Sequence, residues 1–278
     1  MAVSRREMLG SIPGALMAQA GGPVTRYVRY TRQGVTAYGV LEGETVRRLS
    51  GELFGSHKVL AESHKLSEVK LLYPGEPPKV LAVGLNYKSH IGNRPAPARP
   101  EIFYKPTSSL QHPGEPIVIP AGAKNVHYEG ELVIVIGKRL KGASEAEAGK
   151  GIFGYTCGND VSERDWQNGA DKDMQWWRAK GADTFGPMGP CIAKGLDLRK
   201  SRLHTRLNGK VVQEQYVSDL LFGPAAIVSW VSQFVTLVPG DVIFTGTPGT
   251  TQAMKAGDVV EVEIDGIGVL RNPVKAAS

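Results

Sequence analysis

Two glutamates two residues apart, Glu129 and Glu131, stand at the start of the apolar segment Leu132–Ile136. Successive side chains of a β-strand point to opposite faces, so both carboxylates would share one face, which Val133 and Val135 continue. The other face is apolar as well, so we expect a strand that is buried on both sides. Two buried carboxylates repel each other and require compensating positive charge. Mg²⁺, Mn²⁺ or Ca²⁺ would supply it, because these ions prefer carboxylate oxygen.

The alternative for such a pair is a solvated edge strand. Val259–Ile264 also contains two glutamates, Glu261 and Glu263, which alternate with apolar residues. This alternation is typical of a strand with one polar and one apolar face, so we interpret this second pair as solvent-exposed.

A third carboxylate, Asp160, follows the predicted strand Ile152–Cys157. With Glu129 and Glu131 it would complete a three-carboxylate metal site with open positions for water and substrate. The alternative is a local turn in which the Asp160 side chain binds nearby backbone.

Cationic and amide side chains follow. Arg164 and Gln167 are three residues apart, so they would share a face of a helical turn, for which Ser162 is the predicted N-cap. They could hold a substrate carboxylate or carbonyl. Lys180 follows two tryptophans and could act as a fixed, partly desolvated positive charge. The alternatives are a solvated turn and a surface lysine.

His90 lies in a polar loop after an apolar strand and could serve as a general base near neutral pH, although a lone histidine often has no such role. Thr247, in the turn Thr245–Gly249, could present its hydroxyl and backbone N–H groups. This turn lacks the Gly-Lys-Ser/Thr ending of a phosphate loop.

Composition excludes several classes of protein. The net charge of +6 is spread along the 278 residues and suits a small anionic substrate, whereas no basic run indicates nucleic acid. Two isolated cysteines, Cys157 and Cys191, make neither a disulfide framework nor a thiolate zinc site. No apolar run reaches the ~18 residues of a membrane span.

Residues 1–22 resemble a twin-arginine export leader, with Ser4–Leu9 followed by a short apolar stretch and Ala18–Ala20. A cleaved leader would place the protein in the periplasm. The alternative is an N-terminal extension, helical or disordered, on a cytoplasmic protein.

Strands dominate the predicted elements, which indicates a strand-rich α+β fold. Residues 25–72 predict a small N-terminal domain, with three strands up to residue 50 and a polar, helical segment over Lys58–Glu68. The Pro- and Gly-rich stretch Tyr73–Pro78 marks its boundary with a larger unit, residues 73–278. Asn208-Gly209 and Asp265-Gly266 predict hairpins.

Two helices are predicted in the larger unit. Ser144 and Glu147 have the spacing of a capping box. Gly223-Pro224 begins the clearest helix. Its expected apolar stripe consists of Ile227, Val228, Val231, Phe234 and Val235.

Taken in order, six motifs resemble those of the fumarylacetoacetate hydrolase family. They are Gly84–His90, Phe103–Pro106, Tyr128–Leu132, Gly158–Gln167, Arg178–Pro187 and Phe244–Pro248. The resemblance covers about residues 73–275, and residues 25–70 resemble the small N-terminal domain of bacterial members. It implies a mixed β-sandwich roll, usually dimeric, that holds Mg²⁺ or Mn²⁺.

The resemblance also implies roles for individual residues. The metal ligands would be Glu129, Glu131 and Asp160. The catalytic residue would be His90, to which we add Lys180, itself a match to a substrate-contacting position, and Asn93. The substrate-binding positions would be Arg164, Gln167 and Thr247, to which we add Tyr87 and Lys105 of the quoted motifs. The substrates would be small 2-oxo acids.

One position departs from the family pattern. Many members carry a glutamate three residues after the histidine, where this chain has Asn93. Asparagine can orient an imidazole but cannot accept a proton. We expect hydrolysis of a C–C bond in an acylpyruvate-like acid through a metal-stabilised enolate. The alternatives are an isomerase or an oxaloacetate-type decarboxylase that uses the same site, and a non-catalytic 2-oxo acid binding protein.

Overall fold

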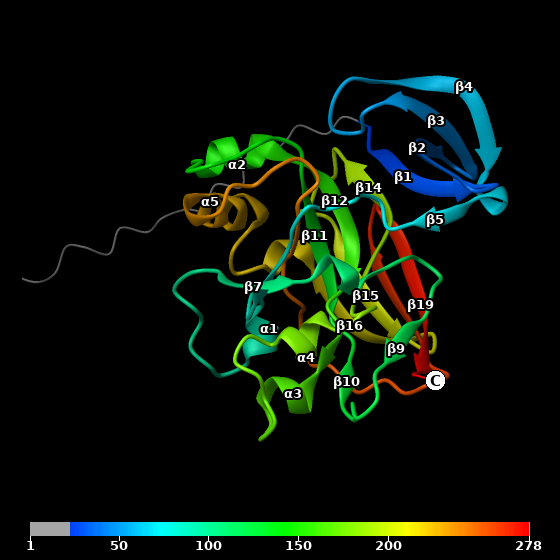
Figure 1. The fold of residues 1–278 in the computed structure, drawn as a ribbon. Helices are drawn as coiled ribbons and strands as arrows, with labels where there is room; N and C mark the ends of the chain where they lie inside the picture. The colour runs from blue at the N-terminus through cyan, green and yellow to red at the C-terminus, as the bar shows by residue number, and fades with distance from the viewer. Residues whose placement is uncertain (1–22, 278) are drawn as a thin grey trace, which may run out of the picture.

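The computed structural model describes residues 23–277, so the leader-like residues 1–22 lie outside the described part of the chain. Two large sheets organise the molecule (Figure 1). The first contains β1 (Thr25–Arg32), β2 (Val35–Glu42), β3 (Thr45–Gly51), β4 (His57–Lys65), β5 (Lys70–Leu72), β6 (Val80–Gly84), β7 (Glu101–Lys105), β8 (Leu110–Gln111), β11 (Gly130–Ile136), β12 (Ile152–Asn159), β14 (Gly186–Lys194) and β17 (Val242–Phe244). The second contains β9 (Ile117–Ile119), β15 (Arg202–Leu207), β16 (Lys210–Tyr216), β18 (Val259–Ile264) and β19 (Gly268–Ala276).

A short ladder, five α-helices and three short 3₁₀ helices complete the described elements. The ladder pairs β10 (Val126–His127) with β13 (Ser162–Glu163). The α-helices are α1 (Lys88–Ile91), α2 (Glu145–Gly151), α3 (Arg164–Asn168), α4 (Trp177–Gly181) and α5 (Pro224–Phe234). The strand-dominated α+β fold is thus confirmed. Within residues 23–277, no helix has the length and apolarity needed to cross a membrane.

Strand β11 is buried along its whole length, as its sequence predicts. It lies between β12 and β17, with both neighbours antiparallel. Val133 and Val135 pack on one face with residues of the N-terminal strands, whereas Ile134 and Ile136 pack on the other face beneath α2 and α5. The strand therefore has no solvent-facing side, and a charged residue on it must find a partner inside the protein.

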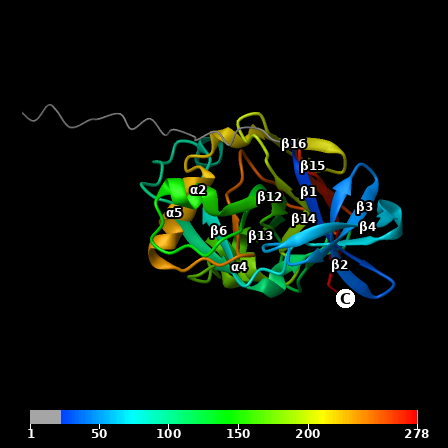
Figure 2. The same cartoon turned by 90° about the horizontal axis from the view of Figure 1, so that it is seen from above.

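The N-terminal strands extend the larger sheet. Strands β4, β3, β2 and β1 follow one another, and β1 then pairs with β14. They form one end of the molecule, opposite the end that carries α2 and α5 (Figure 2). The prediction of a helical segment over Lys58–Glu68 is wrong, because this stretch forms β4 and a 3₁₀ turn. Pairing with β3 satisfies its backbone, which overrides the helical preference of its polar side chains.

The hairpin turn at Asn208-Gly209 and the capping box at Ser144 are confirmed. Asn208 and Gly209 have φ values of 53° and 79°, as a type I′ hairpin turn requires. Ser144 and Glu147 form the predicted capping box at the start of α2. On α5, Ile227, Val228 and Val231 face the core, but Phe234 is 67% exposed. The apolar stripe ends there because Phe234, the last residue of the helix, packs against the surface residue Trp230 instead.

The junction between the N-terminal strands and the rest of the chain contains a histidine held in its neutral form. The Tyr73 N–H donates to His112 Nδ1 at 3.0 Å, and the two rings stack with centroids 4.5 Å apart. Burial lowers the pKa of His112, and the positive charges of Lys70 and Arg29 add to the effect. The folded state therefore binds this proton less readily than the unfolded chain does.

We predict that His112 makes the protein less stable as the pH falls below about 6.5, its usual pKa. Asparagine at this position keeps an acceptor for the Tyr73 N–H but does not titrate. The stability advantage of the wild type over His112→Asn should thus shrink between pH 7.5 and pH 5.5 in urea titrations. A constant difference across this range would contradict the prediction.

Candidate metal centre

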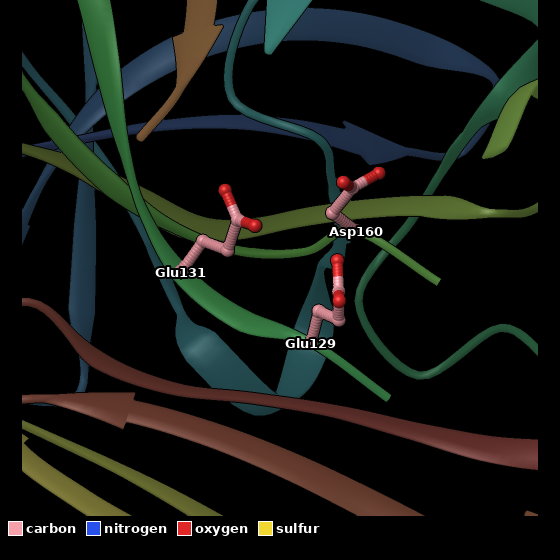
Figure 3. Close-up of side chains that lie close together, drawn as sticks. All are labelled: Glu129, Glu131 and Asp160. Atoms are coloured by element: carbon pink, nitrogen blue, oxygen red, sulfur yellow. The ribbon is translucent and has the colours of Figure 1, made fainter. Parts of the chain in front are cut away.

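Three carboxylates gather where β11 and β12 meet (Figure 3). Glu129 immediately precedes β11, Glu131 is its second residue, and Asp160 follows β12. One oxygen from each carboxylate lies within 4.8 Å of the others, and all three residues are buried. The antiparallel pairing of Gly130 with Asn159 brings the two strand ends together, and the Asp160 N–H donates to the Glu129 carbonyl at 2.9 Å.

Two of the three carboxylates have cationic partners. Lys180 Nζ donates to Glu129 Oε2 and to Asp160 Oδ2, both at 2.6 Å. Lys105 Nζ donates to Asp160 Oδ1 at 2.7 Å, and Arg164 donates to Glu129 Oε1 at 2.5 Å. Glu131 accepts a hydrogen bond from the Gly246 N–H at 2.8 Å and forms no ion pair within residues 23–277. It is the member of the cluster whose charge is uncompensated.

The pKa values follow this difference. Burial, with the negative charges of Asp160 and Glu129, raises the pKa of Glu131 well above its usual value. Burial acts in the same direction on Glu129, but Lys180 and Arg164 outweigh it, so the pKa of that carboxyl is lowered. Burial lowers the pKa of Lys105, whereas for Lys180 the attraction of Asp160 and Glu129 overcomes burial and raises the pKa.

The donor set fits a hard divalent cation. All three groups offer carboxylate oxygen, which Mg²⁺, Mn²⁺ and Ca²⁺ prefer over softer ions. A cation held by Glu129, Glu131 and Asp160 would also supply the positive charge that Glu131 lacks. The second Glu-x-Glu pair differs as predicted, because Glu261 and Glu263 are part-exposed and pair with Arg271 and Arg206 on the surface.

Glycine is required between the two glutamates. A Cβ atom at Gly130 would lie 2.1 Å from Thr205 Oγ1 and 3.3 Å from Gln213 Oε1. Thr205 and Gln213 belong to β15 and β16 of the second sheet, which here packs directly against the β11 backbone. The close approach of the two sheets therefore depends on the missing side chain.

We predict that Gly130→Ala lowers the free energy of unfolding by about 1–3 kcal/mol, the usual cost of overpacking a core. Gly75→Ala is the matched control, because a Cβ there would meet nothing within 4 Å. Urea unfolding of both variants measures the difference. Equal free energies of unfolding for the two variants would show that the two sheets accommodate the added methyl group without a loss of stability.

His90 lies on α1, the short helix that follows β6. Its Nδ1–H donates to the Gly249 carbonyl at 2.7 Å, which leaves Nε2 free to accept a proton. The loop that holds the ring is tied to the cluster, since Thr247, two residues before Gly249, donates its hydroxyl to the Gly130 carbonyl between the two glutamates. Asn93 does not orient the imidazole, as the sequence suggested it could. The Asn93 side chain is exposed and makes no hydrogen bond to His90. The Gly249 carbonyl orients the imidazole instead, by accepting the Nδ1–H.

Arg164 and Gln167 share a face of α3, as predicted, and are joined by a hydrogen bond of 2.7 Å. Ser162 is not the N-cap of this helix. The Glu163 side chain caps it by accepting the Trp166 N–H at 2.6 Å. The Ser162 hydroxyl instead accepts a hydrogen bond from Lys180 at 2.7 Å and donates to the Asp160 carbonyl, because residues 162–163 pair as a strand before the helix begins.

The other predicted substrate-binding residues lie around the cluster in different environments. Tyr87 is 1% exposed, and its hydroxyl has no hydrogen-bond partner among residues 23–277. Burial together with the Glu131 charge raises its pKa. Thr247 donates its hydroxyl to the Gly130 carbonyl at 2.9 Å. Lys105 lies fully buried behind Asp160, so we assign it to the support of that carboxylate.

Several residues of the site were not found from the sequence. Asn159 Oδ1 accepts the Glu129 N–H at 2.8 Å, and its place next to Asp160 was the available signal. Thr251 accepts from Arg164 at 2.8 Å. Asn86 ties the loop before α1 to the end of β17 through the Thr245 carbonyl. Gln213 lies in a hairpin whose sequence indicates only a turn, and no pattern points from it to the site.

Comparison with known proteins agrees with this geometry. Residues 79–275 match the model of the fumarylacetoacetate (FAA) hydrolase C-terminal domain, which is more than half of the chain. The chain belongs to the fumarylacetoacetate hydrolase family. Residues 25–74 match the Rv2993c-like N-terminal model, so both resemblances seen in the sequence are confirmed.

Relatives in the fumarylacetoacetate hydrolase family carry different activities in their names. The 2-hydroxyhepta-2,4-diene-1,7-dioate isomerase of Mycobacterium marinum is 41% identical, with a TM-score of 0.84 over 91% of this chain and 99% of that one. The mitochondrial oxaloacetate tautomerase of Xenopus laevis is 41% identical over 75% of this chain and 69% of its own. The maleylpyruvate hydrolase of Sphingobium sp. SYK-6, solved with manganese(II) and pyruvate, is 26% identical, with a TM-score of 0.75 over 91% of this chain and all of that one.

The cluster predicts opposite effects for two isosteric substitutions in metal-free protein. Glu131→Gln removes an unpaired buried charge and should raise the free energy of unfolding by about 1 kcal/mol. Glu129→Gln leaves Arg164 without its carboxylate and Lys180 with Asp160 alone, and should lower it by about 3 kcal/mol.

The same variants test where the ion binds. Mn²⁺ should raise the melting temperature of the wild type and of the surface control Glu261→Gln, but of neither Glu129→Gln nor Glu131→Gln. An equal rise in Glu131→Gln, measured by differential scanning fluorimetry after chelation and readdition of metal, would place the ion elsewhere.

Proposed function

We propose that this protein is a divalent-metal-dependent isomerase or tautomerase that moves a proton at the carbon next to the keto group of small 2-oxo acids. The observation that carries the proposal is the pairing of one free imidazole nitrogen, His90 Nε2, with a buried three-carboxylate cluster. Enolisation needs one proton-accepting group and a positive environment for the oxyanion, and both are present here.

The residues of this chain have separate tasks in that reaction. His90 Nε2 accepts the proton from the carbon next to the keto group when the enol forms, and it delivers a proton to that carbon when the ketone forms, while the enol oxygen exchanges its own proton with solvent. The Nδ1–H stays on the Gly249 carbonyl throughout, which fixes the tautomer. Lys180 places its ammonium group beside Glu129 and Asp160, where it adds positive charge next to the developing enolate oxygen. When bound by Glu129, Glu131 and Asp160, the cation supplies the charge that makes the enolate accessible.

The surroundings favour a small anionic substrate. Lys180 and Arg164 border the cluster, and the chain as a whole carries a net charge of +6. The names of the relatives agree, since oxaloacetate and a hydroxydienedioate are both acids that interconvert between enol and keto forms. A 2-oxo acid presents a carboxylate and a carbonyl side by side, which suits chelation by a cation in such a site.

Hydrolysis of a C–C bond in an acylpyruvate, the reaction expected from the sequence, is the second candidate. It uses the same enolate and adds the activation of water. The solved hydrolase that holds manganese and pyruvate favours it, because its fold is shared. Against it, no carboxylate among residues 23–277 hydrogen-bonds His90 to help position and deprotonate water. Decarboxylation of oxaloacetate would likewise pass through the same enolate.

One panel of assays separates these reactions. The metal-loaded protein is mixed with the enol form of oxaloacetate, with acylpyruvates and with a hydroxydienedioate, and enol absorbance, pyruvate and CO₂ are followed. We expect enol–keto conversion that EDTA abolishes, without pyruvate release. Pyruvate release from acylpyruvates without enol–keto conversion would establish the hydrolase instead, and binding of oxalate without any turnover would leave a binding protein.

The role of His90 is tested in the same assay. His90→Gln should lower kcat for enol–keto conversion by about 10²–10⁴-fold, the usual contribution of a general base. Its Mn²⁺-induced rise in melting temperature should be unchanged, because the carboxylates are intact. His57→Gln, on the N-terminal strands, serves as the control. Full activity of His90→Gln would remove the imidazole from the mechanism.

A further inference from the structure

Gln213 is the one buried residue of β16. Its side chain is 4% exposed, whereas its neighbours on this outer strand of the second sheet are exposed or part-exposed. A buried amide must have its hydrogen bonds satisfied, because each unpaired polar group costs free energy. The hydrogen-bond partners of Gln213 therefore indicate the structural role of this residue.

The amide of Gln213 connects two parts of the site. Its Oε1 accepts the N–H of Gly130, the residue between Glu129 and Glu131, at 3.2 Å. Its Nε2 donates to Thr247 Oγ1 at 2.8 Å and to the Pro248 carbonyl at 2.6 Å. The hydrogen-bond partners fix this orientation of the amide. In the flipped orientation, the NH₂ group would face the Gly130 N–H, so that two donors meet, and the amide oxygen would face the Pro248 carbonyl, so that two acceptors meet.

The loop that Gln213 holds is the one that orients the imidazole. The Gly249 carbonyl, next to Pro248, accepts from His90 Nδ1 at 2.7 Å, and the Gly249 N–H donates to Ser89 Oγ at 3.0 Å. Gly249 thus contacts both the His90 ring, through its carbonyl, and the Ser89 side chain of α1, through its N–H. Gln213 anchors the peptide that joins Pro248 to Gly249, because its Nε2 donates to the Pro248 carbonyl while its Oε1 accepts the N–H of Gly130, between the two glutamates.

A bulge directs Gln213 toward the site. The register of β15 and β16 shifts between Thr205 and Arg206, which places Gln213 opposite Thr205 and leaves Val212 outside the ladder. Bulges of this kind re-aim side chains and are common near active sites. The bulge thereby brings the amide of a peripheral hairpin into contact with Gly130.

We infer that Gln213 is a positioning residue for His90. By fixing the Thr247–Gly249 loop to the Gly130 peptide, it keeps the Gly249 carbonyl where it accepts the Nδ1 proton, and so leaves Nε2 as the nitrogen that can accept a proton. The inference rests on the proposed function only in taking His90 as the base. The placement of the ring itself does not depend on which reaction follows.

The direct test is the tautomer of His90 in metal-free protein, read from the ring-nitrogen signals of ¹⁵N-histidine-labelled samples. The chain has six histidines, and the spectrum of His90→Gln assigns the signal of His90. In the wild type, we expect His90 to carry its proton on Nδ1. His112 provides a reference of the opposite tautomer, because its Nδ1 accepts the Tyr73 N–H.

Two variants remove the anchor in different ways. Gln213→Met cannot bond either partner, whereas Gln213→Glu keeps an acceptor for the Gly130 N–H and loses the donor for Pro248. Gln215→Met is the matched control, since Gln215 lies on the same strand and bonds the surface residue Asp219. In both Gln213 variants, the His90 signal should move toward a mixture of tautomers, while His112 and the Gln215→Met spectrum stay unchanged.

Kinetics provide the second measurement. With the ring misplaced but the carboxylates intact, kcat for enol–keto conversion should fall about 10–100-fold, while KM changes less than about threefold. An unchanged His90 tautomer in folded Gln213→Glu, or an equal loss in Gln215→Met, would overturn the inference. If Gln213→Met does not fold, Gln213→Glu decides. A wild type without activity would refute the proposed function but leave the tautomer test intact.

Discussion

The structure is governed by the cost of placing three carboxylates within 4.8 Å of one another in the interior. Like charges at this separation oppose one another strongly where water is excluded. Lys180, Lys105 and Arg164 are drawn from three different segments to meet that cost, and each is itself buried or largely covered. Among residues 23–277, Glu131 is the carboxylate of the cluster that has no ion pair. A cation held there would give Glu131 the ionic partner that it lacks, and binding of that ion would then be linked to the stability of the core.

The two sheets divide the work of building this site. The larger sheet supplies the carboxylates at the ends of β11 and β12, where regular pairing fixes their spacing. The smaller sheet supplies no charged group to the cluster, but Thr205 and Gln213 press against Gly130 and tie down the loop that holds His90. The three carboxylates thus lie at the ends of paired strands, whereas His90 lies on a short helix that a loop holds in place. Under the proposed function, the strands would keep the ion fixed and the helix would carry the group that moves the proton.

Much of this could be predicted, because strand periodicity is a strong local signal. The alternation around Glu129 and Glu131, the strand before Asp160 and the hairpin at Asn208-Gly209 all follow from rules that act over a few residues. What failed depended on partners far along the chain. Lys58–Glu68 forms a strand because β3 offers it hydrogen bonds, and Asn93 points to solvent because the backbone of residue 249 lies nearer to the imidazole. No local pattern in a surface hairpin reveals that one glutamine on it reaches the site, because a bulge and the approach of a second sheet decide this.

The pairing of β1 with β14 in the larger sheet bears on how this chain avoids aggregation with other copies of itself. Strand β14 also pairs with β12, which leads directly to Asp160. Without residues 25–72, the outer N–H and C=O groups of β14 would form a bare edge, and bare edges recruit strands from other molecules. The N-terminal strands thus cover the edge of β14 and protect β14 and β12 from pairing with strands of other molecules. Any family member that dispenses with them has to cover that edge by another device.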